Sequence, residues 1–282
     1  MNQEIKDLID ISHFYGSDKE YVIAGGGNTS FKDDNIIRVK ASGEPLSELT
    51  EEGLVTLSRE RLREISRKTY PEDPVKREDQ VKKDLFSSII DTTSGKRPSV
   101  ETSLHEMIRY RYIVHLHPTL INGVLCSRNA RSITTKLFGD KVLFVPYTDP
   151  GYTLFKKLEA DINIYRKVHQ ADPQIIFLEN HGVFVGADNV EGVKEIYRYL
   201  TETIEGLIPR LTNIEPLSYD PIMNKVLPVF RMALSEEKPK IIRYRHNSLI
   251  SKYYTSQQEF NKISLPLTPD MIVYCKTRYL YI

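Results

Sequence analysis

The sequence predicts a layered α/β or α+β domain in which helices cover a sheet. Short runs rich in β-branched and aromatic residues recur up to about residue 212, and segments with helical periodicity lie between them. At 282 residues the chain is long enough to bury a substantial core. It contains no internal repeat and no low-complexity segment.

The helices and strands can be placed from these patterns. Helices are predicted over residues 4–15, 58–68, 79–91 and 100–110, after Pro118 to about 126, after Gly151 to about 168, and from 188 to about 207. Ser58 is expected to cap the N-terminus of the helix over 58–68. Asp188 and Glu191, three residues apart, resemble a capping box at the start of the last helix. Strands or β-rich runs are predicted over residues 21–24, 36–41, 112–117, 142–145, 174–178 and 183–185.

Two segments fall outside this alternation. Residues 68–78 contain Pro71 and Pro74 and are expected to form an exposed linker. Beyond about residue 212 the pattern weakens, so we expect one domain over residues 1–212 and a C-terminal extension over residues 213–282 packed on the same domain. Residues 240–244 and 271–274 look like late strands of this extension.

Composition and charge narrow the class of protein. A formal net charge of +1 gives no electrostatic reason to expect nucleic acid or an anionic membrane as a partner. It does not exclude phosphorylated small molecules as ligands, because their recognition is local. Cys126 and Cys275 are far apart and in no metal-like spacing, which favours a reducing compartment. The N-terminus lacks the apolar core of a signal peptide, and no apolar run approaches the ~20 residues of a membrane helix, so we expect a cytoplasmic protein.

Three histidines are candidates for a metal site. His115 and His117 are two apart on a predicted strand, so both side chains leave the same face, and Pro118 ends the strand directly after them. His181 lies in Asn-His-Gly between two short predicted strands, where Gly182 would let the chain turn sharply. Three histidines at two strand ends can hold a catalytic metal and leave a position open for substrate. The alternative for His115 and His117 is a pair of histidines on a solvated strand face. The alternative for His181 is an ordinary turn residue.

A carboxylate and a glycine-rich segment add to this picture. Glu101 falls in the first turn of a predicted helix, where the alternative to a catalytic role is a charge that simply stabilises the helix end. His105 lies four residues on, on the same helix face, and is expected to be buried or to support a metal ligand and not to be a ligand itself. Gly25-Gly-Gly27-Asn28-Thr-Ser30 resembles a dinucleotide fingerprint, but a β-rich segment follows it instead of a helix, which disfavours a nicotinamide site. As a loop rich in N–H and hydroxyl donors it suits phosphate, and Ser42, Gly43 and Ser99 are further donors of this kind.

Together these segments resemble the class II aldolase/adducin family, and most closely the aldolase half of bifunctional rhamnulose-phosphate aldolase/dehydrogenase proteins. The matching segments agree in order and spacing over about residues 20–205: Gly-Gly-Gly-Asn-Thr-Ser (25–30), Val-Lys-Ala-Ser-Gly (39–43), Pro-Ser-Val-Glu-Thr-Ser-Leu-His (98–105), His-Leu-His-Pro (115–118), Val-Pro-Tyr-Thr-Asp-Pro-Gly (145–151), Asn-His-Gly (180–182) and Leu-Thr-Pro-Asp (267–270). The sequence stops where a dehydrogenase half would begin, so that activity is not implied.

The resemblance implies a three-layer α/β/α catalytic domain with a central, largely antiparallel sheet, assembled as a homotetramer with active sites at subunit interfaces. It implies Zn²⁺, or another divalent metal, on His115, His117 and His181, with Glu101 as the acid/base. The positions that match the family's phosphate-binding residues are Gly27, Asn28, Ser42, Gly43 and Ser99. One position departs from the family: Val100 stands where the simpler fuculose-phosphate aldolases have a second serine.

The function implied is a metal-dependent aldolase that cleaves a ketose 1-phosphate to glycerone phosphate and an aldehyde through a metal-stabilised enediolate. A tyrosine such as Tyr147 could protonate the aldehyde oxygen, and a separate dehydrogenase could consume the aldehyde. The alternatives are a sugar-phosphate 4-epimerase or dehydratase of the same family, or a non-catalytic adducin-like interaction domain. Glu101 favours an aldolase over an epimerase, because the epimerases typically carry Asp at this position. The three histidines disfavour an adducin-like interaction domain, because such domains lose the metal histidines.

Overall fold

The computed structural model describes residues 2–93, 95–208 and 213–281. The chain divides into two compact units. The first comprises residues 1–207 together with 268–270, and the second comprises residues 208–267 with 271–282. The boundary expected at residue 212 lies outside the described residues.

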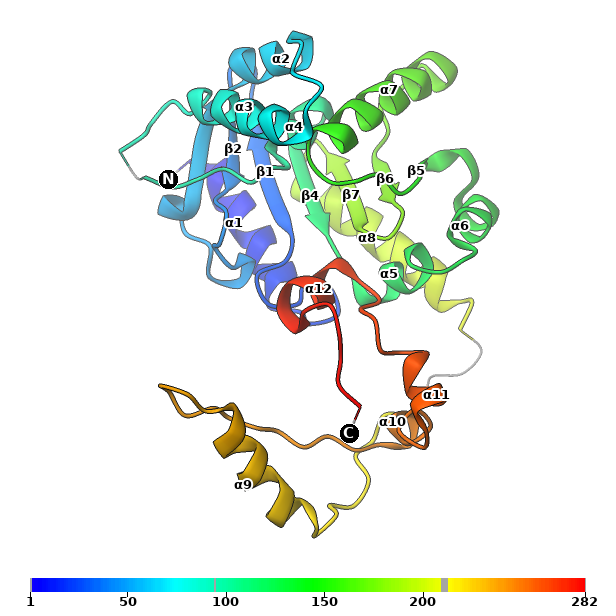
Figure 1. Cartoon of the computed structure of the whole chain (residues 1–282). Coiled ribbons are helices and arrows are strands. Elements are labelled where there is room, and N and C mark those ends of the chain that lie inside the picture. The colour runs from blue at the N-terminus through cyan, green and yellow to red at the C-terminus, as the bar shows by residue number, and fades with distance from the viewer. Residues whose placement is uncertain (1, 94, 209–212, 282) are drawn as a thin grey trace. The chain divides into compact units, whose positions relative to one another are not determined.

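A seven-stranded sheet forms the centre of the first unit (Figure 1). Its strands are β1 (Asn28–Lys32), β2 (Ile36–Lys40), β3 (Leu54–Ser58), β4 (Tyr112–Leu116), β5 (Leu143–Val145), β6 (Ile175–Leu178) and β7 (Gly182–Ala187). Their order is β3-β2-β1-β4-β7-β6-β5, and each neighbouring pair is antiparallel except β5 with β6. The expected largely antiparallel central sheet is therefore confirmed.

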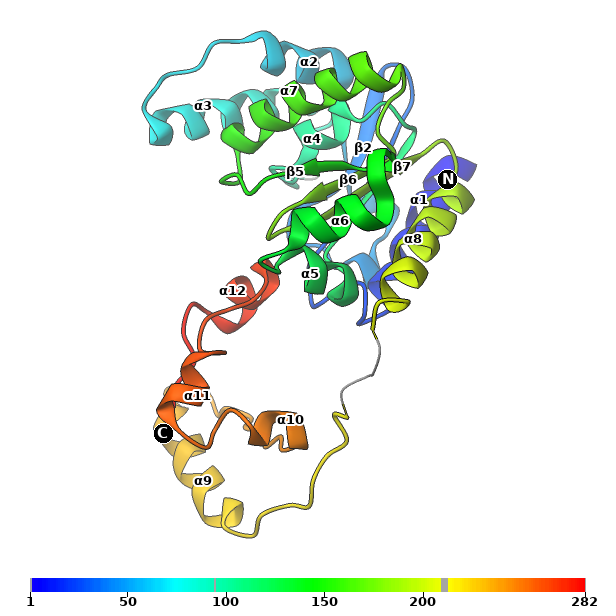
Figure 2. The ribbon, with the colours of Figure 1, turned by 90° about the vertical axis from the view of Figure 1, so that its right-hand side faces the viewer.

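Helices cover both faces of this sheet, as Figure 2 shows from the side. One face carries α2 (Arg59–Arg67), α3 (Pro74–Ser87), α4 (Thr102–Met107) and α7 (Tyr152–His169). The other face carries α1 (Gln3–Gly16), α5 (Thr119–Leu125), α6 (Ala130–Phe138) and α8 (Val190–Glu205). Short 3₁₀ turns occur at Leu46–Glu48, Glu51–Gly53 and Gly139–Lys141. The expected three-layer α/β/α architecture is confirmed.

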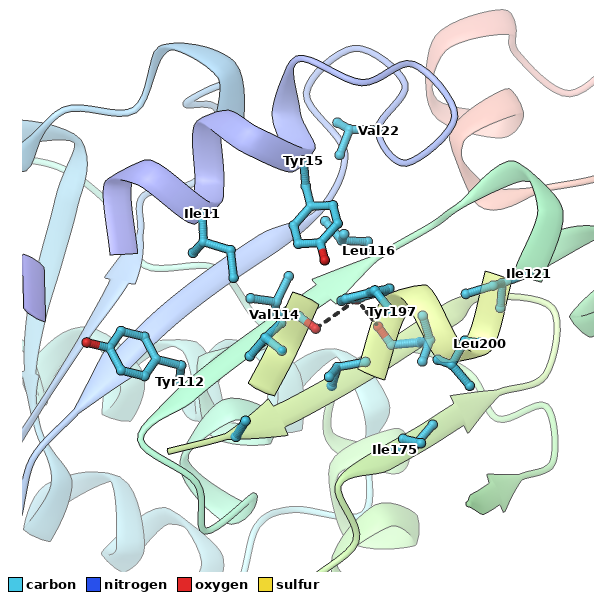
Figure 3. Packing of buried hydrophobic residues seen from close by; sticks show 14 of the residues in the cluster. Ile11, Tyr15, Val22, Tyr112, Val114, Leu116, Ile121, Ile175, Tyr197 and Leu200 are labelled. Carbon is cyan, nitrogen blue, oxygen red and sulfur yellow. Dashed lines mark hydrogen bonds between the residues drawn. The ribbon is translucent and has the colours of Figure 1, made fainter. Parts of the chain in front are cut away.

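The alternation of side chains along β4 separates the core from the candidate site. Tyr112, Val114 and Leu116 pack with α1 and α8, whereas Ile113 packs with α4 and α7 on the opposite face. Tyr197 of α8 is fully buried, and its hydroxyl donates to the carbonyl oxygen of Val114 at 3.0 Å (Figure 3). Because the strand has a period of two, His115 leaves the face that Ile113 occupies, beneath α4.

The β-rich run predicted over residues 21–24 is wrong as a strand. The backbone N–H groups of Tyr21 and Val22 donate to the carbonyl oxygen of Asp18 at 3.0 and 2.9 Å, which closes a turn, and Ala24 has a φ of 53°. The first strand begins instead at Asn28. In the same unit, the strand β3 and the helix α6 were not predicted either.

Two helix starts also differ from expectation. The stretch 68–78 is not wholly a linker, because Asp73 accepts from the backbone N–H of Lys76 and Pro74 opens α3. Proline is favoured at this position because the first helical N–H has no partner within the helix. At the start of α8 the cap is Asn189, whose side chain accepts from Gly192, and not Asp188.

The second unit contains short helices, whereas the sequence suggested two late strands, at 240–244 and 271–274. These are α9 (Met223–Leu234), α10 (Ser248–Ser251) and α11 (Gln257–Asn261), with most of α12 (Pro269–Cys275). The predicted strand at 240–244 has no regular structure, and residues 271–274 lie in α12. A short apolar run does not distinguish strand from helix, and Pro269 favours a helix start. Among the described residues, no helix is long and apolar enough to cross a membrane.

Candidate metal centre

His115 and His117 lie at the end of β4, on the face below α4. His115 is 1% exposed, and the Nε2 atoms of the two rings are 3.1 Å apart. The ring of Phe184, from the neighbouring strand β7, stacks on His115 with centroids 4.0 Å apart. Phe184 is paired with His115 in the β4–β7 register, so the sheet itself holds this ring in place.

His181 reaches the same point from the turn between β6 and β7. The left-handed residue of this turn is Asn180, with a φ of 57°, and not Gly182 as the sequence suggested. Gly182 is needed for a different reason: a Cβ atom there would lie 2.5 Å from Cδ2 of His117 and 2.6 Å from the carbonyl oxygen of Leu116. The Asn122 side chain donates to the carbonyl oxygen of His181 at 3.0 Å and supports the turn.

The remaining ring nitrogens indicate how the cluster can bind a cation. Nδ1 of His115 is 3.1 Å from the carbonyl oxygen of Val183, and Nδ1 of His117 is 2.8 Å from Oδ2 of Asp270. Both partners are acceptors, so both Nδ1 atoms donate and both Nε2 atoms point lone pairs at the shared space. Burial lowers the pKa of His115 well below its ordinary value, which keeps this ring neutral.

The donor set fits a transition-metal ion. One nitrogen from each of His115, His117 and His181 lies within 4.8 Å of the other two. Tetrahedral Zn²⁺ with bonds of about 2.0–2.1 Å to nitrogen places neighbouring nitrogens about 3.3 Å apart. The 3.1 Å between the Nε2 atoms of His115 and His117 is close to that value.

Glu101 is the acidic group of the cluster. Its Oε1 atom is 3.3 Å from Nε2 of His181 and 3.4 Å from Nε2 of His115. Burial would raise the pKa of the carboxyl, but the neighbouring His115 and the hydrogen bond with His181 hold that pKa well below its usual value. The residue precedes α4 and its side chain makes no capping hydrogen bond there. The alternative role, a charge that only stabilises the start of the helix, therefore does not describe the contacts of Glu101, which are with His115 and His181.

Helix α4, which positions Glu101, is anchored at its other end by charged side chains. The Lys32 ammonium donates to the carbonyl oxygens of His105 and Ile108, and burial lowers the pKa of Lys32 to about 7. Arg59 and Arg63 bind the Glu106 carboxylate at 2.8 and 3.1 Å. These contacts satisfy carbonyl groups that have no partner within the helix and fix α4 against β1 and α2.

His105 lies deeper than the metal candidates and is fully buried, as expected from its place on the helix face. Its Nδ1 atom is 2.7 Å from Oγ of Ser30, and burial lowers the pKa of His105 to about 3. Its ring meets Phe184 edge-on at 5.4 Å between centroids. His105 therefore supports the ring that stacks on His115.

The segment expected to be a donor-rich loop is in part a strand. Asn28, Thr29 and Ser30 belong to β1, where Thr29 contacts Ser12 and Ser30 contacts His105. Asn28 is 2% exposed, and its Oδ1 atom is among the buried polar atoms without a hydrogen-bond partner in the described structure. Gly27 has a φ of 80°, which suits glycine, and a Cβ there would lie 2.9 Å from the Leu116 side chain.

The other phosphate-binding candidates are brought together by one bridge. Ala41 pairs with Pro98, which sets Ser42 and Gly43 beside the segment that contains Ser99. Gly43 has a φ of 88°, as a tight turn after β2 requires. The Ser99 hydroxyl accepts from the backbone N–H of Glu101 at 3.2 Å. Val100, next in the chain, is 69% exposed.

Two residues near the site were missed from the sequence. Lys40 is buried, donates to the carbonyl oxygen of Glu44 at 2.7 Å and has its pKa lowered by burial, an effect that Glu101 and Glu44 oppose. Its place in the sequence gave no signal of this burial, because Lys40 falls between Val39 and Ala41, on the polar side of the alternation in the predicted strand. Asp270 contacts His117, and its signal was only its place in the Leu-Thr-Pro-Asp segment. Tyr147, offered as a proton donor, is 57% exposed and its hydroxyl is 3.2 Å from Asp149.

Comparison with known proteins is in line with this architecture. The chain is 26% identical over 301 aligned residues to the "uncharacterized oxidoreductase YuxG" of Bacillus subtilis (strain 168); the match covers 99% of this chain and 42% of the relative, so the chain spans less than half of that protein's length. It shares its fold with the N-terminal class II aldolase domain of a conserved protein from Thermoplasma acidophilum, with a TM-score of 0.61, 24% identity and coverage of 73% of this chain and 94% of the other. YgbL from Klebsiella pneumoniae has a TM-score of 0.52 and 20% identity, with coverage of 76% and 91%.

The match to a family model is decisive because of its extent. The model of the class II aldolase and adducin N-terminal domain matches residues 6–207, which takes in all three histidines and Glu101. The chain therefore belongs to the class II aldolase and adducin N-terminal domain family.

Proposed function

We propose that this protein is a metal-dependent aldolase that cleaves a ketose 1-phosphate, of the rhamnulose- or fuculose-phosphate kind, to glycerone phosphate and an aldehyde. The observation that carries the proposal is the convergence of His115, His117 and His181 on one point with the Glu101 carboxylate beside them. Zn²⁺ is the metal we expect, with another divalent ion as the alternative.

The chemistry requires a base and a way to stabilise negative charge. A divalent cation on the histidines would supply Lewis-acid stabilisation of the charge that develops as the carbon–carbon bond breaks. In the cleavage direction, the hydroxyl next to the breaking bond loses its proton and becomes the aldehyde oxygen, while the bonding electrons pass into an enediolate. Glu101, ionised and 20% exposed, would take up this hydroxyl proton and deliver it to the enediolate carbon, which yields glycerone phosphate.

The phosphate is assigned to the two segments beside β1 and β2. Gly27 and Asn28 lead into β1, where the backbone and side-chain N–H groups are the donors that phosphate would need. The buried amide oxygen of Asn28 has no protein partner among the described residues, and as an acceptor it suits a hydroxyl group of the substrate. Ser42, Gly43 and Ser99 meet through the bridge between Ala41 and Pro98 and offer hydroxyl and backbone donors.

The wider organisation of the protein is also a proposal. We assign residues 1–212 to the catalytic domain and residues 213–282 to a C-terminal extension, and we expect a homotetramer in the cytoplasm. The likeness to an oxidoreductase more than twice as long supports a dehydrogenase as the enzyme that consumes the aldehyde.

Metal analysis followed by a cleavage screen tests the function. We expect close to one zinc per chain and release of glycerone phosphate from at least one ketose 1-phosphate, both lost after treatment with a chelator and regained with Zn²⁺. Full turnover by metal-free protein would overturn the proposal. Bound zinc without cleavage of any ketose 1-phosphate would instead favour a dehydratase or an epimerase on the same site.

A further inference from the structure

Asp270 reaches the histidine cluster from a distant part of the chain. It lies in the first turn of α12, 153 residues after His117, and residues 268–270 belong to the first unit although residues 208–267 do not. Its Oδ2 atom is 2.8 Å from Nδ1 of His117, and the residue is 5% exposed. Burial of a carboxylate is costly unless it is paired and hydrogen-bonded, and the hydrogen bond from His117 offsets part of that cost.

The glycine-rich segment leaves room for this carboxylate. A Cβ atom on Gly26 would lie 2.8 Å from Oδ1 of Asp270 and 3.2 Å from the carbonyl oxygen of Ile23. A side chain at position 26 would therefore displace the Asp270 carboxylate or the turn that holds it. The middle glycine of the three is thus required for the contact between Asp270 and His117.

The contact determines which nitrogen of His117 is available. An ionised carboxylate only accepts hydrogen bonds, so Nδ1 of His117 donates and Nε2 keeps its lone pair. That Nε2 atom faces Nε2 of His115 at 3.1 Å. His115 is oriented in the same manner by a backbone group, the carbonyl oxygen of Val183. Histidine ligands of metals in proteins commonly donate their second nitrogen to a carboxylate or a carbonyl oxygen, which raises ligand basicity.

The two carboxylates in contact with the histidines together carry the charge that balances a divalent cation. Three neutral imidazoles contribute no charge, and Glu101 and Asp270 contribute one negative charge each. A divalent cation in their midst would give a neutral group, which reduces the cost of holding its charge in a mostly buried site.

We propose that Asp270 is a positioning residue of the metal centre, which fixes the tautomer and ring orientation of His117 and thereby strengthens cation binding. The inference rests on the proposed function in one respect, because it requires a divalent cation on the three histidines. It gives residues 268–270, which belong to the first unit, a direct part in completing the site.

The test uses the 282-residue chain with Asp270→Ala and Asp270→Asn. The alanine variant removes both the acceptor and the charge, whereas the asparagine variant keeps an acceptor oxygen. Zn²⁺ affinity is measured by competition with a chromophoric chelator, and the absorption spectrum of the Co²⁺-loaded protein reports the geometry around the ion. We expect Asp270→Ala to weaken Zn²⁺ binding about 10–100-fold and to change the Co²⁺ spectrum, with Asp270→Asn between it and the wild type.

Two controls separate positioning from folding. Asp188→Ala removes an exposed aspartate that accepts from the backbone N–H of Arg111 and should leave Zn²⁺ affinity unchanged. Gly26→Ala keeps the Asp270 carboxylate but crowds it, and Gly123→Ala, where an added Cβ meets nothing within 4 Å, is its matched control. We expect weaker Zn²⁺ binding in Gly26→Ala and unchanged binding in Gly123→Ala. If Asp270→Ala does not fold in chelator, the comparison of these two glycine variants is the test.

The outcomes for the two proposals are distinct. Tight Zn²⁺ binding by the wild type with unchanged affinity in Asp270→Ala, or in Gly26→Ala if the former does not fold, overturns the role of Asp270 alone. A wild-type chain that binds no divalent cation overturns the proposed function and this inference with it. The histidine ring signals of metal-free protein give an independent readout, because loss of the Asp270 contact should shift His117 away from the tautomer with hydrogen on Nδ1.

Discussion

Asn28 lies directly opposite His115 in the antiparallel pairing of β1 with β4. The glycine-rich segment and the metal candidates are therefore placed next to each other by the register of two neighbouring strands. Both residues are buried, at 2% and 1% exposure. A slip of this register by one residue would send either side chain to the opposite face, so the phosphate candidate and the metal candidate depend on the same strand pairing.

Asn28→Asp should impair substrate binding in the folded protein. The substitution conserves shape but adds a negative charge where we place the substrate phosphate, and the cost of burying that charge should also lower the free energy of unfolding. We expect KM for a ketose 1-phosphate to rise by about 10–100-fold, the range for loss of a hydrogen bond to a charged group. Steady-state kinetics check this, with the exposed Asn35→Asp as control. An unchanged KM would remove Asn28 from the phosphate site.

Gly182→Ala should break the histidine cluster. The new Cβ atom would lie 2.5 Å from Cδ2 of His117 and 3.2 Å from Cε1 of His115, so at least one ring must move. We expect bound zinc to fall well below one per chain, measured by metal analysis after dialysis. Gly123→Ala is the control, since an alanine there has open space and better helix propensity. Full zinc content in Gly182→Ala would show that the cluster is not the metal site.

Glu101→Gln should separate metal binding from turnover. The amide keeps the size of the side chain near His115 and His181 but cannot act as the base. We expect kcat to fall by at least about 10²-fold while the protein still takes up close to one zinc at saturation, as general-base catalysis of this kind contributes about 10²–10⁴-fold. Glu48→Gln, at an exposed position, is the control. Unaltered kcat would exclude Glu101 as the proton-transfer group.

His105 should make the folded protein sensitive to acid. Because burial lowers the pKa of His105 from 6.5 to about 3, the unfolded chain binds a proton between these values that the folded chain does not. Stability therefore falls as the pH falls through this range, by about 1.4 kcal/mol per pH unit, or about 2 kcal/mol between pH 6.5 and 5. His105→Asn removes the titrating group, so its free energy of unfolding should fall less steeply with acid. Urea unfolding in chelator at several pH values measures this, and parallel pH profiles for the two proteins would contradict it.

The sequence could predict the parts of the fold that depend on local pattern. The period of two in Tyr112–Leu116 placed His115 and His117 on one face, and the apolar runs ending at Val145 and Leu178 were recognisable as strands. Residues 28–30 were harder, since Asn, Thr and Ser next to glycines resemble a loop. Burial against β2 and β4 makes them a strand regardless of local preference.

The unpredicted parts of the site depend on contacts between distant residues. Nothing local to Asp270 indicates a partner 153 residues earlier, because pairing over that separation is a property of the folded chain. The role of Gly182 was misassigned for the same reason: its need for glycine comes from the rings of His115 and His117, not from its own φ. The apolar run at 271–274 was assigned to a strand although Pro269 starts a helix.

Val100→Ser should show whether the valine at this position, where the fuculose-phosphate aldolases have a serine, affects binding of the substrate phosphate. Val100 is 69% exposed and lies between Ser99 and Glu101, so the change should alter the free energy of unfolding by less than about 0.5 kcal/mol. If the phosphate lies against this segment, one added hydroxyl should contribute about 1 kcal/mol and lower KM about fivefold with little change in kcat. Val100→Ala, which removes the same methyl groups without adding a donor, is the matched control. Equal KM values for the serine and alanine variants would mean that the phosphate is bound without this position, and that Val100 does not account for a change of substrate.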